Sequence, residues 1–382
     1  MTILRDQFMQ VVDQRFFHGT KIMTNFNNPP FPSSQVQDYP DGSLDQHDWP
    51  DDEYQENEQR YSNCLKQLLH LLQQIANSGR IPDVMSSQAR VTRSNSVAKG
   101  YQSLFNHLDK YLETVVMLPG EYEYDEHLNV FIRCCKQLLL LPVSSGSRLE
   151  ITWKTFRQLI DLIHDQYGTV LFGDKLRIQR RDAAKRYEEY SNYVDALFDS
   201  HARLIVLRLD LYYLEKYAAK ISLGTALADL DRFFANMRNN SLFTELEGYI
   251  VKTEFGIERG IHFHLILFFN GARRRGASHV IHAREMGEYW SNTITEKRGW
   301  YWNCNAEAEK FESKGRLGIG LIHWSDTALR NNLLKLVLTY FFKTGQCFRS
   351  KLWPKARLIR RGLYPVSYAV KLGRPRSEIG LS

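Results

Sequence analysis

The sequence predicts an α+β protein, in which a helical N-terminal domain is followed by an antiparallel sheet with helices packed on it. Residues 61–198 carry apolar side chains at helical spacing, and near residue 201 the pattern changes to short apolar or alternating runs typical of strands. The length of 382 residues suits more than one core, since a single core rarely exceeds about 250–300 residues. We therefore divide the chain into residues 1–58, 59–200, 201–345 and 346–382.

Composition and charge narrow the class of protein. Hydrophobic residues make up 43% and charged residues 24%, as in globular folds, and no apolar run is long enough to cross a bilayer. The N-terminus does not resemble a secretory signal and the 5 cysteines form no CxxC pair, so we expect a cytosolic chain with reduced thiols. Residues 1–200 hold 21 basic and 27 acidic residues, whereas residues 201–382 hold 29 and 16. The basic second half favours a nucleic-acid partner.

The first half is predicted to be a flexible segment followed by helices. Within residues 1–58, the stretch 28–58 holds 5 of the 11 prolines and an acidic run with few aliphatic side chains. A solvated linker is the simpler interpretation of this acidity, and mimicry of DNA is the alternative. The helices are predicted over residues 61–76, 101–116, 127–140, 152–164 and 181–198. We find no catalytic pattern in this half.

The second half is predicted to have the element order β-α-β-β-α-β-α, with its helices on one face of the sheet. The strands are predicted over residues 204–213, 248–256, 260–271 and 318–324, and the helices over 225–239, 280–294 and 327–342. The short IERG connection makes the second and third strands a hairpin. The last helix, capped by Ser325 or Asp326, should bury Leu333, Leu336 and Val337 against the sheet.

A pair of histidines in the hairpin is the first candidate for chemistry. His262 and His264 are two residues apart in a strand, so their imidazoles emerge on the same face. A turn centred on Glu258 places Glu254 opposite His262, which adds a carboxylate to this face. Two imidazoles, a carboxylate and water form a suitable shell for Mg²⁺ or Mn²⁺.

Alternatives to this metal site stay open at the level of sequence. A register slip of one residue would replace Glu254 by Thr253 or Phe255. Glu254 can also pair with Arg259 or Lys252, and the two histidines can be structural residues satisfied by their neighbours.

The last predicted helix offers a nucleophile. Tyr340 and Lys343 are three residues apart in the run YFFK, so both lie on one face of the helix. The ammonium group favours ionisation of the phenol or neutralises a phosphate. An attacking phenolate would yield a phosphotyrosine, which conserves the energy of the cleaved bond for rejoining. The alternative is that Tyr340 is a core residue of an aromatic-rich chain.

Two basic segments are candidates for DNA contacts. The first follows the histidine strand directly, where guanidinium groups suit phosphates beside a metal, although a solvated cluster is an equal alternative. The second is a C-terminal arm that interleaves arginines with Trp353 and Tyr364, a composition suited to backbone contacts and base stacking. The candidate residues are Arg273, Arg274 and Arg275 in the loop, and Arg349, Lys351, Arg357, Arg360 and Arg361 in the arm.

The run HFH followed by LILFFNG, with YFFK downstream, resembles the HUH endonuclease superfamily of rolling-circle replication initiators. Within it, the chain looks like the inovirus (filamentous-phage) gene-two-type replication proteins of phages and prophages, over about residues 200–350. The resemblance implies that His262, His264 and the preceding Glu254 hold the metal. It also implies that Tyr340 is the nicking tyrosine and that Lys343 is the lysine of the YxxK motif.

The sequence and this resemblance together predict an endonuclease that nicks and rejoins single-stranded DNA at a replication origin through a 5′-phosphotyrosine. Its partners would be single-stranded or origin DNA and the host replication machinery, in the cytoplasm of a bacterial host and without a membrane. Two alternatives remain: a DNA-binding regulator on the same fold without catalysis, and a tyrosine recombinase. The recombinase would need no metal, and the strand-borne HFH argues against it.

Overall fold

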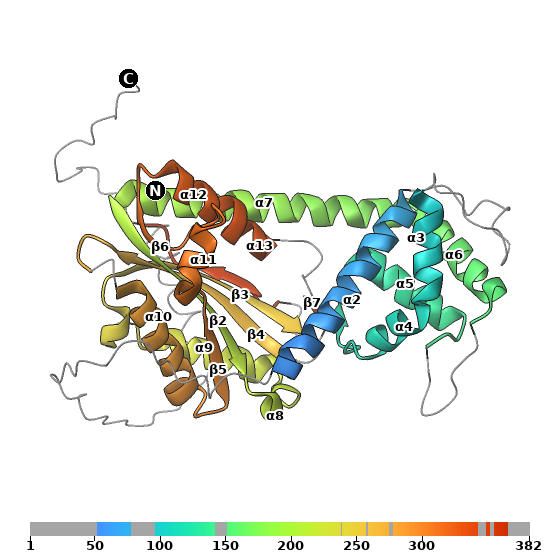
Figure 1. Ribbon diagram of the computed structural model, residues 1–382, viewed down its shortest axis with the longest axis horizontal. Coiled ribbons are helices and arrows are strands. Elements are labelled where there is room, and N and C mark those ends of the chain that lie inside the picture. Colours follow the sequence, from blue (N-terminus) through green and yellow to red (C-terminus); the bar gives the residue numbers. More distant parts are fainter. Residues whose placement is uncertain are drawn as a thin grey trace, which may run out of the picture. The chain divides into compact units, whose positions relative to one another are not determined.

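The computed structural model of the protein describes residues 52–77, 96–141, 151–237, 239–256, 259–274, 278–342, 349–351 and 355–365. It is a mixed α+β structure with an antiparallel sheet, as the sequence predicts (Figure 1). Within these ranges, every helix is too short or too polar to cross a lipid bilayer.

The main sheet has β2 and β4 at its centre. Its strand order is β5-β2-β4-β3-β8, β6 also pairs with β2, and all of these pairs are antiparallel. The predicted hairpin is formed by β3 and β4. The sheet strands are β2 (Arg203–Tyr213), β3 (Leu246–Gly256), β4 (Gly260–Asn270), β5 (Gly299–Asn303), β6 (Gly320–His323) and β8 (Ile359–Arg361).

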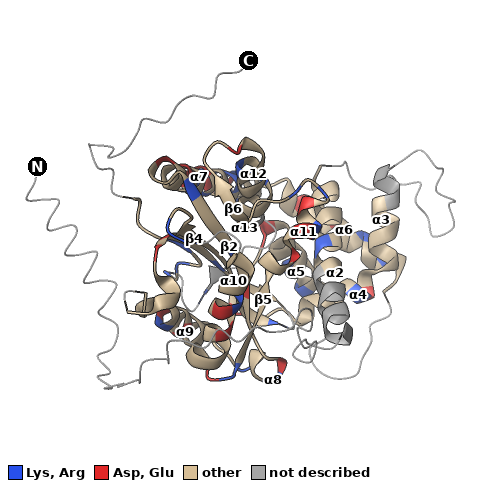
Figure 2. Cartoon of the chain, turned by 60° about the vertical axis from the view of Figure 1, so that its left-hand side comes forward, with Lys and Arg blue, Asp and Glu red and all other residues tan. Residues whose placement is uncertain are grey.

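Helices cover both faces of this sheet, so the expectation of helices on one face is wrong. One face packs on α9 (Leu223–Ala235), α10 (His279–Glu288) and the π-helical η4 (Tyr289–Ile294). The other face packs on the C-terminal half of α7 (Val170–Ser200), the π-helical η6 (Leu333–Leu338) and α13 (Thr339–Phe342). Figures 1 and 2 show the two groups on opposite sides of the strands. The reason lies in β4, whose residues 260–269 are all buried, as expected of a strand covered on both sides.

The helical region has a hydrophobic core of its own, built from aliphatic and aromatic side chains of five helices and the start of α7. The predicted helix 101–116 is two helices that meet at His107, and the predicted helix 181–198 begins earlier, at Val170. The helices are α2 (Asp52–Ala76), α3 (Ser96–Asn106), α4 (Leu108–Val116), α5 (Glu126–Gln137) and α6 (Trp153–Tyr167).

Two boundaries of the predicted segments differ in the structure. Residues 52–58, expected to be flexible, form the start of α2, because their Glu and Gln residues favour helix and the sequence contains no proline between Pro50 and Pro82. The boundary at residue 200 coincides with the end of α7, but this helix contributes to both cores: Phe172 packs in the helical region and Leu197 under the sheet. The rest of residues 1–58 lies outside the described ranges.

Side-chain caps explain where several of these helices begin. Ser222 accepts a hydrogen bond from the backbone N–H of Thr225 at the start of α9, and Thr169 caps α7 in the same way. Asp326 rather than Ser325 caps α12 (Thr327–Asn332), by accepting from the N–H of Leu329.

Short elements complete the description. β1 (Tyr122–Glu123) and β7 (Arg349–Ser350) form a separate two-stranded antiparallel sheet. The predicted arm 346–382 thus contributes β7 there, and it also contributes β8, the edge strand beside β3, to the main sheet. The remaining elements are α8 (Glu215–Ala218), η2 (Ser241–Phe243), η5 (Cys304–Glu307) and α11 (Ala308–Glu312).

Candidate metal centre

The β3–β4 hairpin brings the three predicted metal ligands together. Glu254 pairs directly with His262, which confirms the predicted register, and His264 lies two residues further along the same face. All three side chains are buried, and one ligand atom from each lies within 4.8 Å of the others. The Oε2 atom of Glu254 is 3.1 Å from Nε2 of His264 and 3.7 Å from Nε2 of His262. Two imidazole nitrogens and one carboxylate oxygen therefore converge on one point.

The second nitrogen of each imidazole is held by an acceptor. Nδ1 of His262 is 3.2 Å from the carbonyl oxygen of Gly260, and Nδ1 of His264 is 2.6 Å from Oδ1 of Asp210. When both Nδ1 atoms donate their hydrogens to these acceptors, both Nε2 lone pairs are available to a cation. The acceptors at Nδ1 are thus compatible with the tautomer that a metal ligand needs.

Each of the two carboxylates of the centre, Glu254 and Asp210, also has a cationic neighbour. The ammonium group of Lys252, which is 2% exposed, pairs with Oε1 of Glu254. A guanidinium nitrogen of Arg208 is 2.9 Å from Oδ1 of Asp210. Of the two alternative partners considered for Glu254, Lys252 is the one in contact, whereas Arg259 donates to the hydroxyl of Tyr212 over 3.2 Å. Because Lys252 occupies only Oε1, the other oxygen still faces the histidines.

These contacts determine the protonation of the ligands. Burial alone would raise the pKa of Glu254, but His264, His262 and Lys252 outweigh it and hold this pKa well below its usual range. Burial lowers the pKa of His262 below its ordinary value. Burial would also lower the pKa of His264, but Asp210 and Glu254 outweigh it and raise this pKa. At neutral pH the carboxylate is ionised and the His262 ring is neutral, the forms in which both bind a metal.

The donor set fits a divalent cation. Two imidazoles and a carboxylate on one face leave the remaining coordination positions to water or substrate, as in catalytic sites. Carboxylate and imidazole together suit several divalent metals, so the ligands specify a metal site without specifying the metal.

The end of the last helical segment packs on the histidine face. The ring of Phe341 in α13 lies 6.2 Å from that of His264, and the Arg208 guanidinium is 4.9 Å from the centre of the Phe341 ring. Tyr340 is the preceding residue of α13, so its Cα lies about 3.8 Å from that of Phe341. The side chain of Tyr340 and the whole of Lys343 lie outside the described residues.

The predicted apolar stripe of this helix is partly wrong. Leu333 is buried as expected, but Leu336 is 43% exposed, and the buried residues that follow are Leu338 and Phe341. The reason is that residues 333–338 form a π-helix, in which bonds from i to i+5 shift the buried face by about one residue. Helical spacing of 3.6 residues cannot anticipate this shift.

The sequence prediction missed a row of aromatic rings beside the centre. Strand β5 was not predicted, and it pairs Trp300 with Tyr212 of β2. The Tyr212 ring stacks on His262 with centroids 5.2 Å apart, and the Trp300 ring stacks on Tyr212 at 4.5 Å. The available signal was the run GWYWN, in which tryptophans alternate with other residues as in a strand.

The predicted DNA-contacting arginines of the loop have different environments. Arg273 is largely exposed, with an ion pair of 3.3 Å to Glu245. Arg274 is used inside the protein, because its guanidinium donates to the backbone oxygens of Ser241 and Thr244 and lies 5.0 Å from the centre of the Phe269 ring. Arg275 lies outside the described residues.

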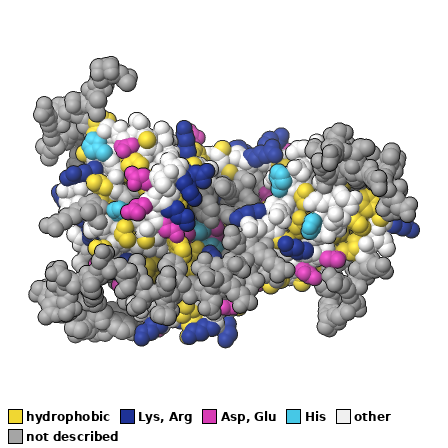
Figure 3. Space-filling view, viewed as in Figure 1, with side chains coloured by type: hydrophobic (Ala, Val, Ile, Leu, Met, Phe, Trp, Pro, Cys, Tyr) yellow, Lys and Arg dark blue, Asp and Glu magenta, His cyan; other side chains and the backbone are white. Residues whose placement is uncertain are grey.

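The basic residues of the C-terminal segment are largely engaged with the protein. Arg361 contacts Glu189 at 3.0 Å, and Arg360 pairs with Asp231. Arg357 is exposed, and the side chain of Arg349 lies outside the description. Figure 3 shows that Lys and Arg side chains lie over both the helical region and the sheet region. Of the described candidates, Arg273, Lys351 and Arg357 are exposed.

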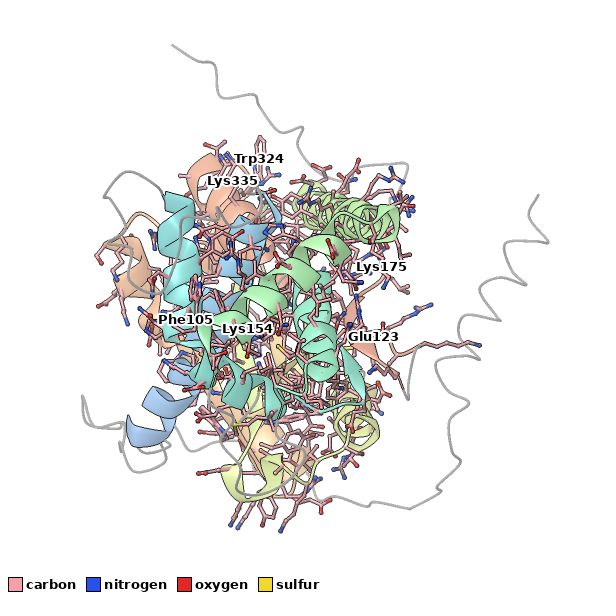
Figure 4. All side chains as sticks on the ribbon, turned by 90° about the vertical axis from the view of Figure 1, so that its right-hand side faces the viewer. Phe105, Glu123, Lys154, Lys175, Trp324 and Lys335 are labelled. Atoms are coloured by element: carbon pink, nitrogen blue, oxygen red, sulfur yellow. The ribbon has the colours of Figure 1, made fainter. Side chains whose placement is uncertain are left out.

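A separate cavity of about 690 Å³ lies beside α4, α5, β1 and α7. Its lining includes Lys351, another predicted DNA contact, whose ammonium group donates to the carbonyl oxygen of Gly120 over 2.7 Å. Glu123 of β1 and Lys175 of α7 also line it and are labelled in Figure 4. Lys175 is 3.1 Å from the buried Glu126, so these two charges of the wall are paired. The cavity is distinct from the metal centre.

Comparisons of this chain with protein-family models, with curated proteins and with solved structures gave no match.

Proposed function

We propose that the protein is a metal-dependent endonuclease that nicks and rejoins single-stranded DNA at a replication origin, with Tyr340 as the nucleophile. One observation carries the proposal: Glu254, His262 and His264 gather their ligand atoms on the sheet face that contacts Phe341, the neighbour of Tyr340. A cation site and a tyrosine nucleophile are the pairing that phosphodiester transfer to tyrosine requires. The resemblance of HFH and YFFK to the HUH superfamily supports the same reaction.

In this proposal, different residues of the chain hold the cation and orient its ligands. Glu254, His262 and His264 hold the cation, which we take to be Mg²⁺ or Mn²⁺ and which, when bound, withdraws charge from the phosphate oxygens. Asp210 and Gly260 orient the two imidazoles. Burial of Glu254, His262 and His264 strengthens their electrostatic effect.

The covalent step is a displacement at phosphorus. The phenolic oxygen of Tyr340 forms a bond to the scissile phosphorus, and the bond from phosphorus to the 3′ oxygen breaks. The phenol gives up its proton to solvent, and the departing oxygen takes one up to become a 3′-hydroxyl. The products are a 5′-phosphotyrosine and a primer end that a host polymerase in the bacterial cytoplasm can extend. The reverse displacement rejoins the strand without ATP, and Lys343 assists by stabilising the phenolate.

The test is covalent capture of DNA. The purified full-length protein is incubated with Mn²⁺ and fluorescent single-stranded oligonucleotides, both a random-sequence pool and a tiling of the DNA that flanks its gene. We expect an adduct that survives denaturing electrophoresis, that EDTA prevents, and that Tyr340→Phe and His262→Ala abolish. Tyr364→Phe is the matched control, because Tyr364 is an exposed tyrosine that contacts Arg361 of the edge strand β8.

Other outcomes would replace the proposal. Absence of any adduct with either DNA set, in Mg²⁺ or Mn²⁺, overturns the nuclease. Unchanged DNA binding by His262→Ala without cleavage would indicate the regulator. An adduct that forms equally in EDTA would indicate a tyrosine recombinase.

A further inference from the structure

Three stacked rings connect the metal centre with the edge of the sheet. His262, a metal ligand, stacks on Tyr212 with ring centroids 5.2 Å apart and an interplanar angle of 19°. Tyr212 stacks on Trp300 at 4.5 Å and 15°. The rings come from neighbouring strands in the order β4, β2 and β5, so the row crosses the sheet from its centre to an edge strand. It provides a continuous π-stacked path from a metal ligand to Trp300.

Trp300 differs from the other members of the row in its exposure. Tyr212 is 4% exposed and His262 is 6% exposed, whereas Trp300 is half-buried. Among the described residues, Trp300 also belongs to neither hydrophobic core of the sheet, although its strand neighbours Tyr301 and Trp302 each pack against one. A large indole that the cores do not use, at the accessible end of a stacked row, is suited to a planar partner from outside.

Positive charge lies beside the same row. The guanidinium of Arg259 is 5.0 Å from the centre of the Tyr212 ring and donates a hydrogen bond to its hydroxyl. Arg259 is half-buried at the turn of the hairpin that carries His262. An aromatic surface with an adjacent guanidinium is the combination that recognises nucleotides, with stacking for the base and charge for the phosphate.

We infer that Trp300 is a stacking platform for an unpaired nucleobase of single-stranded DNA that is bound next to the metal centre. This inference rests on the proposed function for the identity of the nucleic acid. A base can stack on a protein ring only when its face is free, so the site selects single strands over duplex. Stacking recognises the base face rather than its hydrogen-bonding edge, so Trp300 holds the strand in place without specifying its sequence.

The experiment compares DNA binding by variants that cannot cleave. All proteins carry Tyr340→Phe, and their affinity for a fluorescent 20-mer of thymidine is measured by anisotropy with Mn²⁺ present. Trp300→Leu should weaken binding about 5- to 100-fold, and Trp300→Phe should recover most of it, because phenylalanine keeps a π face. Trp324→Leu is the matched control, since Trp324 is a half-buried tryptophan beside α12, labelled in Figure 4. Urea unfolding confirms that each variant is folded.

A second probe isolates the base. An abasic 20-mer has the same phosphates but no bases, so we expect it to bind weakly and equally to Trp300→Leu and its Trp300 parent. Equal loss of affinity for both probes, or equal binding of duplex, would overturn the inference. Its failure is distinguishable from that of the proposed function: base-dependent binding without any covalent adduct retains the platform and removes the nuclease. If a protein with Tyr340 intact forms an adduct while Trp300→Leu binds DNA as well as its parent does, the nuclease is retained and the stacking platform is removed.

Discussion

Both faces of the central strands are largely buried, but they carry different side chains. Along β2, Leu207, Leu209 and Leu211 point into the core with α9 and α10, whereas Arg208 and Asp210 point to the face with the metal ligands. Burial of leucine stabilises a fold with no further requirement. Burial of charge stabilises it only when each charge has a partner. The difference teaches that similar burial stabilises the fold on one face and gathers a candidate metal site on the other.

The polar face meets this requirement by pairing. Lys252 pairs with Glu254, Arg208 with Asp210, and Asp210 with His264. Breaking a buried pair by removing one partner costs more than the pair contributes when intact, because the remaining charge is left without compensation. The comparison between the faces can therefore be tested one charge at a time.

The largest loss of stability is expected for Lys252→Met. Methionine fills much of the same volume but leaves the buried Glu254 carboxylate without its ammonium partner. We expect the free energy of unfolding to fall by about 3–5 kcal/mol in EDTA. Urea unfolding followed by circular dichroism measures this change.

The double variant Lys252→Met/Glu254→Gln is the control for that change. It removes both charges, so its loss should be smaller than the sum of the two single losses. Mn²⁺ should restore more stability to Lys252→Met than to the wild type, because a bound cation replaces the missing charge. If Lys252→Met unfolds at the same urea concentration as the wild type, the ion pair contributes nothing to stability.

On the apolar face, His282 is expected to make a smaller contribution to the free energy of unfolding, and this contribution depends on pH. Burial is the main cause that lowers the pKa of His282 to about 4; the Leu242 carbonyl opposes the decrease and Arg274 adds to it. Nε2 donates to the Leu242 oxygen over 2.8 Å while Nδ1 accepts from Arg274 over 2.9 Å, an arrangement that suits the neutral ring. The unfolded chain takes up this proton near pH 6.5, whereas the folded chain does so only near pH 4.

The contribution of His282 to stability is therefore fully present above pH 6.5 and is lost as the pH falls toward 4. The loss amounts to about 3 kcal/mol over this window. Unfolding measured at several pH values should show a weaker dependence for His282→Gln than for the wild type. His323→Gln, which changes an exposed histidine, should keep the wild-type dependence. A His282→Gln profile parallel to that of the wild type would contradict the assignment.

The sequence predicted that Glu254, His262 and His264 lie together because the signals for this grouping are local in the sequence. The strand alternation of His262 and His264 and the short connection after Gly256 specify the hairpin, and the hairpin specifies that Glu254 lies opposite His262. Pairing of Glu254 with Lys252 is an alternative to the metal site at the level of sequence. In the structure Glu254 contacts Lys252 through one carboxylate oxygen and His264 through the other, so the two contacts coexist.

The features that the sequence did not predict depend on contacts between distant segments. β5 has only five residues, and β8 lies in a basic segment that reads as an arm until its pairing with β3 is known. The π-helix from Leu333 to Leu338 has no sequence signature that a 3.6-residue period can detect. The second layer of helices on the sheet is likewise a tertiary property, although the unbroken apolar run of β4 was a signal for it.

The smallest change in free energy is expected for Asp210→Asn, and it should be specific to metal binding. Asp210 is not one of the three residues whose ligand atoms converge, but its carboxylate accepts from Nδ1 of His264 at 2.6 Å and thereby orients that imidazole. Asparagine keeps an acceptor oxygen and loses the charge, so Mn²⁺ affinity should fall about 10- to 100-fold, as measured by titration calorimetry. Asp229→Asn is the matched control: Asp229 is a buried carboxylate that accepts a hydrogen bond from the Tyr213 hydroxyl over 2.8 Å, on the opposite face. This control should lose stability and keep its Mn²⁺ affinity. If both variants lose affinity to the same degree, the effect is general loosening of the sheet, and the functional distinction between its two faces does not hold.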